Sequence, residues 1–164
     1  MNPINAISVS VGVLVTTWCF ITFGFLEPAV VTWITFLTWA SFFAAGGGIA
    51  GLVKATACGW TGALLAALVM WLSPRLGGGS SGTGLVVLCL LLGLLGWTLC
   101  QLSRTTWLSV IPGSFIGAAA FFGAGAPLDG RLGSVLVSLL IGALLGLSSQ
   151  RLAALLGRKP ASSA

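Results

Sequence analysis

Side chains that could line a solute path recur at a regular spacing between residues 32 and 41. Thr32, Thr35, Thr38 and Ser41 follow one another at intervals of three. This spacing places their hydroxyls along one face of a helix, where they could present polar groups to a permeating solute. Alternatively, each hydroxyl bonds a carbonyl of its own helix, as Ser and Thr side chains often do. We therefore expect either a polar helix face that lines a solute path or a set of hydroxyls that each bond a carbonyl of their own helix.

The segment Pro112–Gly117 is a second candidate for such a path. Pro112 removes a backbone donor and obstructs the preceding turn, and Gly113 adds conformational freedom directly after it. Inside a membrane, freed backbone groups must be buried in protein or line a wet cavity. A helix broken here could expose carbonyls beside Ser114 and Gly117 to a solute. The alternatives are an ordinary proline kink or a helix start near the bilayer surface.

Two pairs of aromatic residues stand just before glycine-rich segments. Phe42-Phe43 precedes Gly46, and Phe121-Phe122 precedes Gly123. The two pairs could form constrictions at opposite mouths of a path. Packing against lipid or neighbouring helices is the alternative, because aromatic side chains bury large areas.

Groups that could carry out catalysis are scarce. The chain has no His, and its two acids, Glu27 and Asp129, are far apart in sequence. A His-dependent triad, a His metal site and a paired-carboxylate centre are therefore excluded. The four cysteines lack metal-ligand spacing. We expect no enzyme activity, no cofactor and no bound metal.

The composition requires that these residues lie in a lipid bilayer. Of the 164 residues, 57% are hydrophobic and only 5% are charged, and the mean hydropathy is +1.12. Soluble domains carry about 25% charged residues, and a spanning helix needs roughly 20 apolar residues. We predict an all-α polytopic bundle of six spans, with five as the alternative count. The predicted spans cover residues 6–26, 28–46, 52–73, 84–103, 106–126 and 132–150.

The seven basic residues predict the orientation in the membrane. With six spans, one side holds the N-terminus and five of them: Lys54, Arg104, Arg151, Arg158 and Lys159. The other side holds Arg75 and Arg131 with both acids. Positive residues accumulate on the cytoplasmic side, so both termini are expected there. The net charge of +5 does not indicate nucleic-acid binding, because no contiguous basic stripe is present.

The two halves of the chain resemble each other. A shift of 79 positions places Trp18 on Trp97, and six of the twelve positions from Thr35 to Gly46 are then identical to their counterparts. With one extra residue in the second half, Gly62-Ala63-Leu64-Leu65 coincides with Gly142-Ala143-Leu144-Leu145. Chance similarity within an Ala-, Gly-, Leu- and Phe-rich chain is the alternative. We predict two three-helix repeats, residues 1–80 and 81–157, followed by a cytoplasmic tail at 158–164. Because three is odd, the repeats would be inverted relative to each other.

The stretch Leu108–Ala118, followed by Phe122 and Gly123, resembles the YcdZ-like inner-membrane family, a group defined by a domain of unknown function (1097). Its most specific part is the Pro-Gly-[Ser/Thr]-Phe-Ile-Gly segment, which begins at Pro112. The resemblance implies a multi-spanning protein of the bacterial cytoplasmic membrane. The resemblance implies no particular substrate and no catalytic residue.

Together these features favour a passive channel or facilitator for a small neutral polar solute. No Asp or Glu lies within a predicted span, whereas proton- and cation-coupled carriers usually place ionisable groups there. The expected partners are the bilayer, further copies of the chain and the solute, but no nucleic acid. A non-transporting scaffold or accessory subunit is the alternative and predicts a dry interface between the halves.

Overall fold

The computed structural model describes residues 1–157, which contain helices and no strand. The all-α prediction is therefore confirmed for this part of the chain. The predicted tail at 158–164 lies outside the described residues. The helices are α1 (Pro3–Ile21, continued by the π-helical turn η1, Thr22–Leu26), α2 (Thr32–Ala44), α3 (Gly48–Leu72, continued by the 3-10 turn η2, Ser73–Leu76), α4 (Gly82–Leu102), the 3-10 turn η3 (Thr106–Leu108), α5 (Ile111–Gly123) and α6 (Arg131–Gly157).

The six main helices fall into two length classes. Four of them, α1, α3, α4 and α6, are long and apolar enough to cross a membrane. Helices α2 and α5 have 13 residues each, which corresponds to about 20 Å at 1.5 Å per residue. The hydrocarbon core is about 30 Å thick, so α2 and α5 are shorter than the predicted spans 28–46 and 106–126. Extended backbone at Val31 and a non-helical residue at Val110 set their starts.

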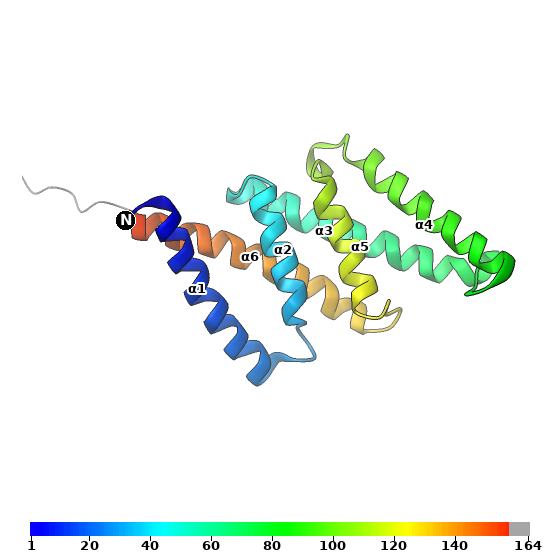
Figure 1. Ribbon diagram of the computed structural model, residues 1–164, viewed down its shortest axis with the longest axis horizontal. Coiled ribbons are helices and arrows are strands. Elements are labelled where there is room, and N and C mark those ends of the chain that lie inside the picture. The colour runs from blue at the N-terminus through cyan, green and yellow to red at the C-terminus, as the bar shows by residue number, and fades with distance from the viewer. Residues whose placement is uncertain (158–164) are drawn as a thin grey trace, which may run out of the picture.

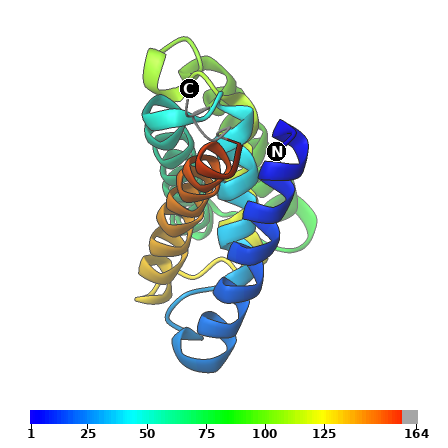
Figure 2. The same cartoon turned by 90° about the vertical axis from the view of Figure 1, so that its left-hand side faces the viewer.

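The ends of the helices gather at two opposite faces of the molecule (Figures 1 and 2). One face holds the N-terminus, the α2–α3 connection, the α4–α5 connection and the end of α6. The other face holds the α1–α2, α3–α4 and α5–α6 connections. The two described chain ends lie together, because a Cβ built on Gly157 would be 4.0 Å from the Cβ of Ala6. Successive helices thus run in alternating directions between the two faces.

Each short helix packs mainly on a long helix of the other half of the chain. Helix α2 lies against α6, and α5 lies against α3. A glycine makes each contact possible. A Cβ on Gly62 of α3 would overlap the carbonyl oxygen of Ser114, and a Cβ on Gly142 of α6 would overlap that of Thr35. Small residues let membrane helices approach to backbone contact in this way.

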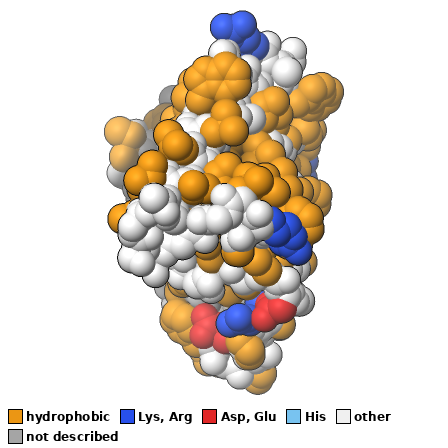
Figure 3. Space-filling view, turned by 90° about the vertical axis from the view of Figure 1, so that its right-hand side faces the viewer, with side chains coloured by type: hydrophobic (Ala, Val, Ile, Leu, Met, Phe, Trp, Pro, Cys, Tyr) orange, Lys and Arg blue, Asp and Glu red, His pale blue; other side chains and the backbone are white. Residues whose placement is uncertain are grey.

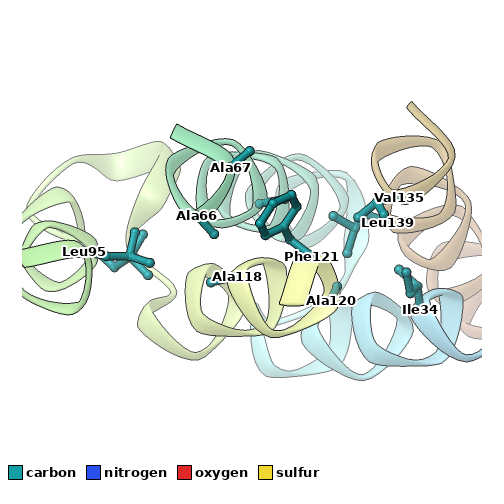
Figure 4. Packing of buried hydrophobic residues seen from close by; sticks show 11 residues of the cluster. Ile34, Ala66, Ala67, Leu95, Ala118, Ala120, Phe121, Val135 and Leu139 are labelled. Carbon is teal, nitrogen blue, oxygen red and sulfur yellow. The ribbon is translucent and has the colours of Figure 1, made fainter. Parts of the chain in front are cut away.

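The largest cluster of buried apolar residues fills the junction between these helix pairs (Figure 4). The fully buried Phe121 side chain of α5 belongs to this cluster, and α3, α2 and α6 contribute residues that include Ala66, Ile34 and Leu139. Aromatic and branched side chains here supply the packing that positions α2 and α5. The core therefore holds the two short helices side by side at the centre of the molecule.

Helices α1 and α4 lie at opposite ends of the long axis (Figure 1). Helix α1 lies along α6 in the antiparallel direction, with the Ser10 hydroxyl donating to the carbonyl of Ser149 at 2.7 Å. Helix α4 approaches α3 and α5 less closely. Within residues 1–157, no α4 side chain forms a hydrogen bond with another helix. The two outer helices are thus attached to the core in different ways.

Candidate functional site

The hydroxyls of α2 divide into satisfied and unsatisfied groups. Thr35 Oγ1 accepts the indole N–H of Trp18 at 2.9 Å and donates to the carbonyl of Thr32 at 2.6 Å. Thr38 and Ser41 are buried, and their hydroxyls have no hydrogen-bond partner among residues 1–157. The Thr32 hydroxyl donates to Glu27 Oε1 at 2.8 Å, outside its own helix. Bonding to a carbonyl of the same helix, the alternative to a polar path, therefore holds for Thr35 alone.

The Pro112 segment forms the start of a helix. Pro112 occupies the first turn of α5, where its missing N–H is not needed for the helix. It does not interrupt a longer helix, so the predicted break within a span is replaced by a helix start. The next two residues are buried, and the Ser114 hydroxyl has no partner within the described chain.

Two of the predicted segments meet at the centre of the molecule. A Cβ built on Gly113 would lie 2.8 Å from Ser41 Oγ and 3.0 Å from the Cβ of Cys58. Gly113 is therefore the point at which α5, α2 and α3 approach one another. Gly117 lies elsewhere, because a Cβ there would overlap the backbone of Gly59 in α3. Of the predicted path residues, Ser41 and Gly113 come together directly.

The two aromatic pairs have matching environments. Phe42 and Phe121 are fully buried, whereas Phe43 and Phe122 are 42% and 37% exposed. The rings within each pair meet edge to face, with centroids 5.3 Å and 5.4 Å apart. Each pair thus contributes one ring to the core and one to the outer surface. Their predicted role as constrictions stays a prediction.

The turns after these pairs have the same backbone geometry. Gly46 and Gly125 have φ of 90° and 86°, and the residues that follow them, Gly47 and Ala126, have φ of 69° and 51°. The Gly47 N–H donates to the Phe42 carbonyl at 3.1 Å, and the Ala126 N–H donates to the Phe121 carbonyl at 3.0 Å. A left-handed conformation at a helix end satisfies carbonyls that the helix leaves free.

Several polar contacts were missed by sequence reasoning. The Trp39 indole donates to Ser149 Oγ at 3.0 Å, and the Val31 N–H donates to Ser138 Oγ at 2.8 Å. Both serines lie on α6, 107 or more positions away along the chain. No local spacing signals such pairs, since they exist only where α2 packs on α6. The one available hint is that Ser residues interrupt an otherwise apolar span.

Comparison with known proteins decides the family. A family model described as "Protein of unknown function (DUF1097)" matches residues 8–154. The chain belongs to this family. It is 31% identical over 151 residues to "Inner membrane protein YcdZ" of Salmonella typhimurium, covering 89% of this chain and 84% of the relative. The Escherichia coli protein of the same name is 28% identical over 150 residues, covering 89% and 83%. The "Uncharacterized protein YahC" of Escherichia coli is 30% identical over 132 residues, covering 76% and 78%.

These matches confirm the resemblance to the YcdZ-like family. No solved structure matches the chain. The relatives named YcdZ are inner membrane proteins, and four described helices are long and apolar enough to span a bilayer. This DUF1097 chain is therefore a helical membrane protein.

Most charged groups of this family member lie in or next to the connections between helices. Figure 3 shows two acidic groups and a basic group close together at one face. Asp129 accepts the Arg131 guanidinium at 3.1 Å and the Arg131 backbone N–H at 2.9 Å. The hydrogen bond from the guanidinium lowers the pKa of the Asp129 carboxyl. Beside this pair, a cavity of about 440 Å³ lies between the α1–α2 and α5–α6 connections.

Proposed function

We propose that this protein crosses the inner membrane six times as two inverted three-helix repeats and provides a passive path for a small neutral polar solute. The path runs between α2 and α5, at the contact of Ser41 with Gly113. The observation that carries the proposal concerns four buried hydroxyls that have no hydrogen-bond partner within residues 1–157. Three of them lie on α2 and α5, at Thr38, Ser41 and Ser114, and the fourth is on Thr56 of α3. The steps below give the support for the repeat, the path and the orientation in turn.

The repeat is supported by geometry that recurs at corresponding residues. Under the 79-residue register Thr35 corresponds to Ser114, and with the extra residue Gly62 corresponds to Gly142. The Gly62–Ser114 and Gly142–Thr35 contacts are therefore equivalent. Chance similarity in a glycine-rich chain would not place equivalent residues in equivalent contacts. The matching turns after Phe42 and Phe121 support the same conclusion.

The six crossings are supported by the alternating helix directions. The connections fall at two opposite faces (Figure 1). Helices α2 and α5 reach these faces with the help of non-helical segments at their ends. Non-helical backbone at membrane depth is tolerated where protein buries it or where it lines a wet cavity. Both short helices lie at the centre of the bundle, where these conditions apply.

The polar path is supported by the cost of leaving hydroxyls unpaired. A buried group without a partner costs about 1–3 kcal/mol, and the bilayer core offers no water to compensate. The three hydroxyls on the adjoining helices α2 and α5 therefore destabilise the fold unless a ligand forms hydrogen bonds with them. A small solute with donors and acceptors, such as an amide or a polyol, supplies that partner. No catalytic group is needed for this role.

The orientation is supported by the positions of the basic residues. Lys54, Arg104 and Arg151 lie toward the face that holds the N-terminus, whereas Arg75 and Arg131 lie toward the other. Positive residues favour the cytoplasmic side, so both ends of the chain are assigned to the cytoplasm. Arg158 and Lys159 lie outside the described residues.

The test is solute uptake into liposomes that contain the purified protein. Small amides, polyols and ammonia are compared with protein-free vesicles. Thr38→Val and Ser41→Ala remove two central hydroxyls with little change in volume and are expected to lower uptake at least several-fold. Thr17→Val is the matched control, because Thr17 is exposed and its hydroxyl bonds a carbonyl of its own helix. Uptake equal to that of empty vesicles for every solute would overturn the proposal.

The scaffold function is a second candidate, supported by the close packing of the halves. Gly62, Gly117 and Gly142 bring neighbouring backbones into direct contact, which leaves no room for a solute along the α3–α5 and α2–α6 contacts. In a facilitator the path must therefore open between α2 and α5 while these glycine contacts stay closed. A scaffold predicts that Thr38→Val and Ser41→Ala raise stability and alter no flux.

A further inference from the structure

The cavity of about 440 Å³ between the α1–α2 and α5–α6 connections stands at one end of the central helices. Two of its lining residues mark that end, because Val31 directly precedes α2 and Ala124 directly follows α5. The start of α6 forms a further wall. Small-molecule sites in proteins have volumes of about 300–1,000 Å³. The cavity is therefore large enough to hold a small solute beside the α2–α5 pair.

Two polar side chains line this otherwise apolar cavity. Apart from Arg131 and Ser134, its lining residues are Pro, Ala and Val. In the described chain, the Arg131 guanidinium bonds Asp129 through Nε alone, which leaves both terminal nitrogens without a partner. Ser134 accepts the Ser138 hydroxyl at its carbonyl, whereas its own hydroxyl forms no hydrogen bond within residues 1–157. A few polar groups among apolar walls are typical of a small-molecule site.

The charges around the cavity disfavour an ionic ligand. The Asp129 carboxylate lies 3.1 Å from Arg131 Nε, so the two charges offset each other. The other acidic group beside this pair in Figure 3 is Glu27, because the chain has only two acids. An anion that approached Arg131 would meet both carboxylates, and a cation would meet the guanidinium in the cavity wall. A neutral ligand avoids both repulsions.

A small amide has the groups that this cavity leaves unpaired. Its carbonyl oxygen accepts hydrogen bonds from guanidinium nitrogens, and its amino group donates to a hydroxyl oxygen. Its short hydrocarbon part suits apolar walls such as those of Val31 and Val135. The Arg131 side chain is 72% exposed, so a solute can reach the guanidinium directly from the surrounding water.

The inner end of the cavity is closed by the core. Val31, Ala124 and Val135 line the cavity and also pack in the buried cluster that contains Ile34 and Phe121. The side chains of Ile34 and Phe121 are fully buried. The cavity is thus a site at the mouth of the α2–α5 pair, and apolar side chains separate it from the unpaired hydroxyls farther along α2.

We propose that this cavity binds a small neutral amide, which accepts hydrogen bonds from the Arg131 guanidinium and donates one to the Ser134 hydroxyl. The binding itself does not involve the hydroxyls of Thr38, Ser41 and Ser114. The role of the site rests on the proposed function: the cavity is the entrance to the path at the face away from the N-terminus, where the solute is held before it passes between α2 and α5.

Binding is measured by saturation-transfer NMR with acetamide on the full-length protein in lipid nanodiscs. We expect a signal above that of empty nanodiscs, and a signal at least several-fold weaker for acetate, which has the same shape but a negative charge. Arg131→Met removes the guanidinium donors and should weaken the acetamide signal at least several-fold. Arg75→Met is the matched control and should leave the signal unchanged, because Arg75 lies toward the same face but packs over the Trp71 ring.

Two further variants fill the cavity from different walls. Ala29→Trp does so from the α1–α2 connection and Ser134→Leu from α6, and both should abolish the acetamide signal. Ala29 is exposed, so its replacement spares the core, and thermal unfolding checks the fold of both variants. An acetamide signal equal to that of empty nanodiscs, a signal that survives both variants, or an equally strong acetate signal would overturn the proposal.

Uptake into liposomes separates this site from the path. A folded Ala29→Trp protein that takes up amides as fast as the unmodified protein would overturn the entrance role and leave the path in place. Acetamide binding that is lost in both filling variants, in a protein that takes up no solute, would sustain the site and reject only the path.

Discussion

The central helices of the two halves are alike, whereas their first helices differ. Helices α2 and α5 have the same length, the same turn geometry at their ends and equivalent glycine contacts with α6 and α3. Helix α1 bonds to the core through Ser10 and Trp18, but α4 has no equivalent bond in the described chain. Backbone contacts at glycines thus hold the centre together. Polar side-chain bonds attach α1 to it, whereas α4 is attached by apolar side chains such as Leu95 and Leu99.

The largest effect is expected where the halves are most alike. Gly62→Leu and Gly142→Leu each force a side chain into a neighbouring backbone carbonyl. Overpacking costs about 1–3 kcal/mol where neighbours can move, and more where the obstacle is backbone. We expect both variants to lose the folded state in detergent, measured by thermal unfolding. Gly12→Leu and Gly93→Leu are controls, because a Cβ there meets nothing within 4 Å. If only one of the two variants lost the folded state, the two halves would not be packed equivalently.

A smaller effect separates the two outer helices. Trp18→Phe removes a hydrogen bond to Thr35 and should lower the free energy of unfolding by about 1 kcal/mol. Trp97→Phe replaces a largely exposed indole with a smaller ring and should change the free energy of unfolding by no more than about 0.5 kcal/mol. Denaturation in mixed micelles measures both. Equal losses would mean that α4 is attached as firmly as α1.

The smallest effect concerns the starts of the long helices. The first N–H of α3, on Gly48, donates to the Gln150 side chain at 2.7 Å, whereas the Arg131 N–H of α6 donates to the Asp129 carboxylate. The pKa of the Asp129 carboxyl is lowered from its ordinary value of 3.8. The contribution of this carboxylate to folding stability is therefore present above that value and is lost as the pH falls through the lowered pKa. We expect a slight loss of stability in that acid range, abolished in Asp129→Asn. Since the pair is exposed, an unchanged acid profile in Asp129→Asn would show that solvent screens it fully.

The helical class, the membrane environment and the family were all accessible from sequence. The long apolar segments containing α1, α3, α4 and α6 exclude a soluble protein, since hydropathy depends only on local composition. The Pro112 segment identified the family and an important helix, yet its local pattern left a kink and a helix start equally open. Sequence marked where α2 and α5 lie but overestimated their lengths, because apolar flanking residues do not reveal an extended backbone.

The amino-acid sequence by itself determined that the chain needs lipid, because hydropathy follows from residue types in order along the chain. The relation between its two halves stays a prediction of the sequence. Only the tertiary structure decided which hydroxyls find partners. Thr35 and Ser114 correspond in sequence, but one receives an indole N–H and the other does not. That difference depends on which face of an outer helix packs on the core. In α4 the buried side chains are those of Leu95 and Leu99, and helical spacing places Trp97 on the opposite face. Only the packing of distant segments sets that orientation.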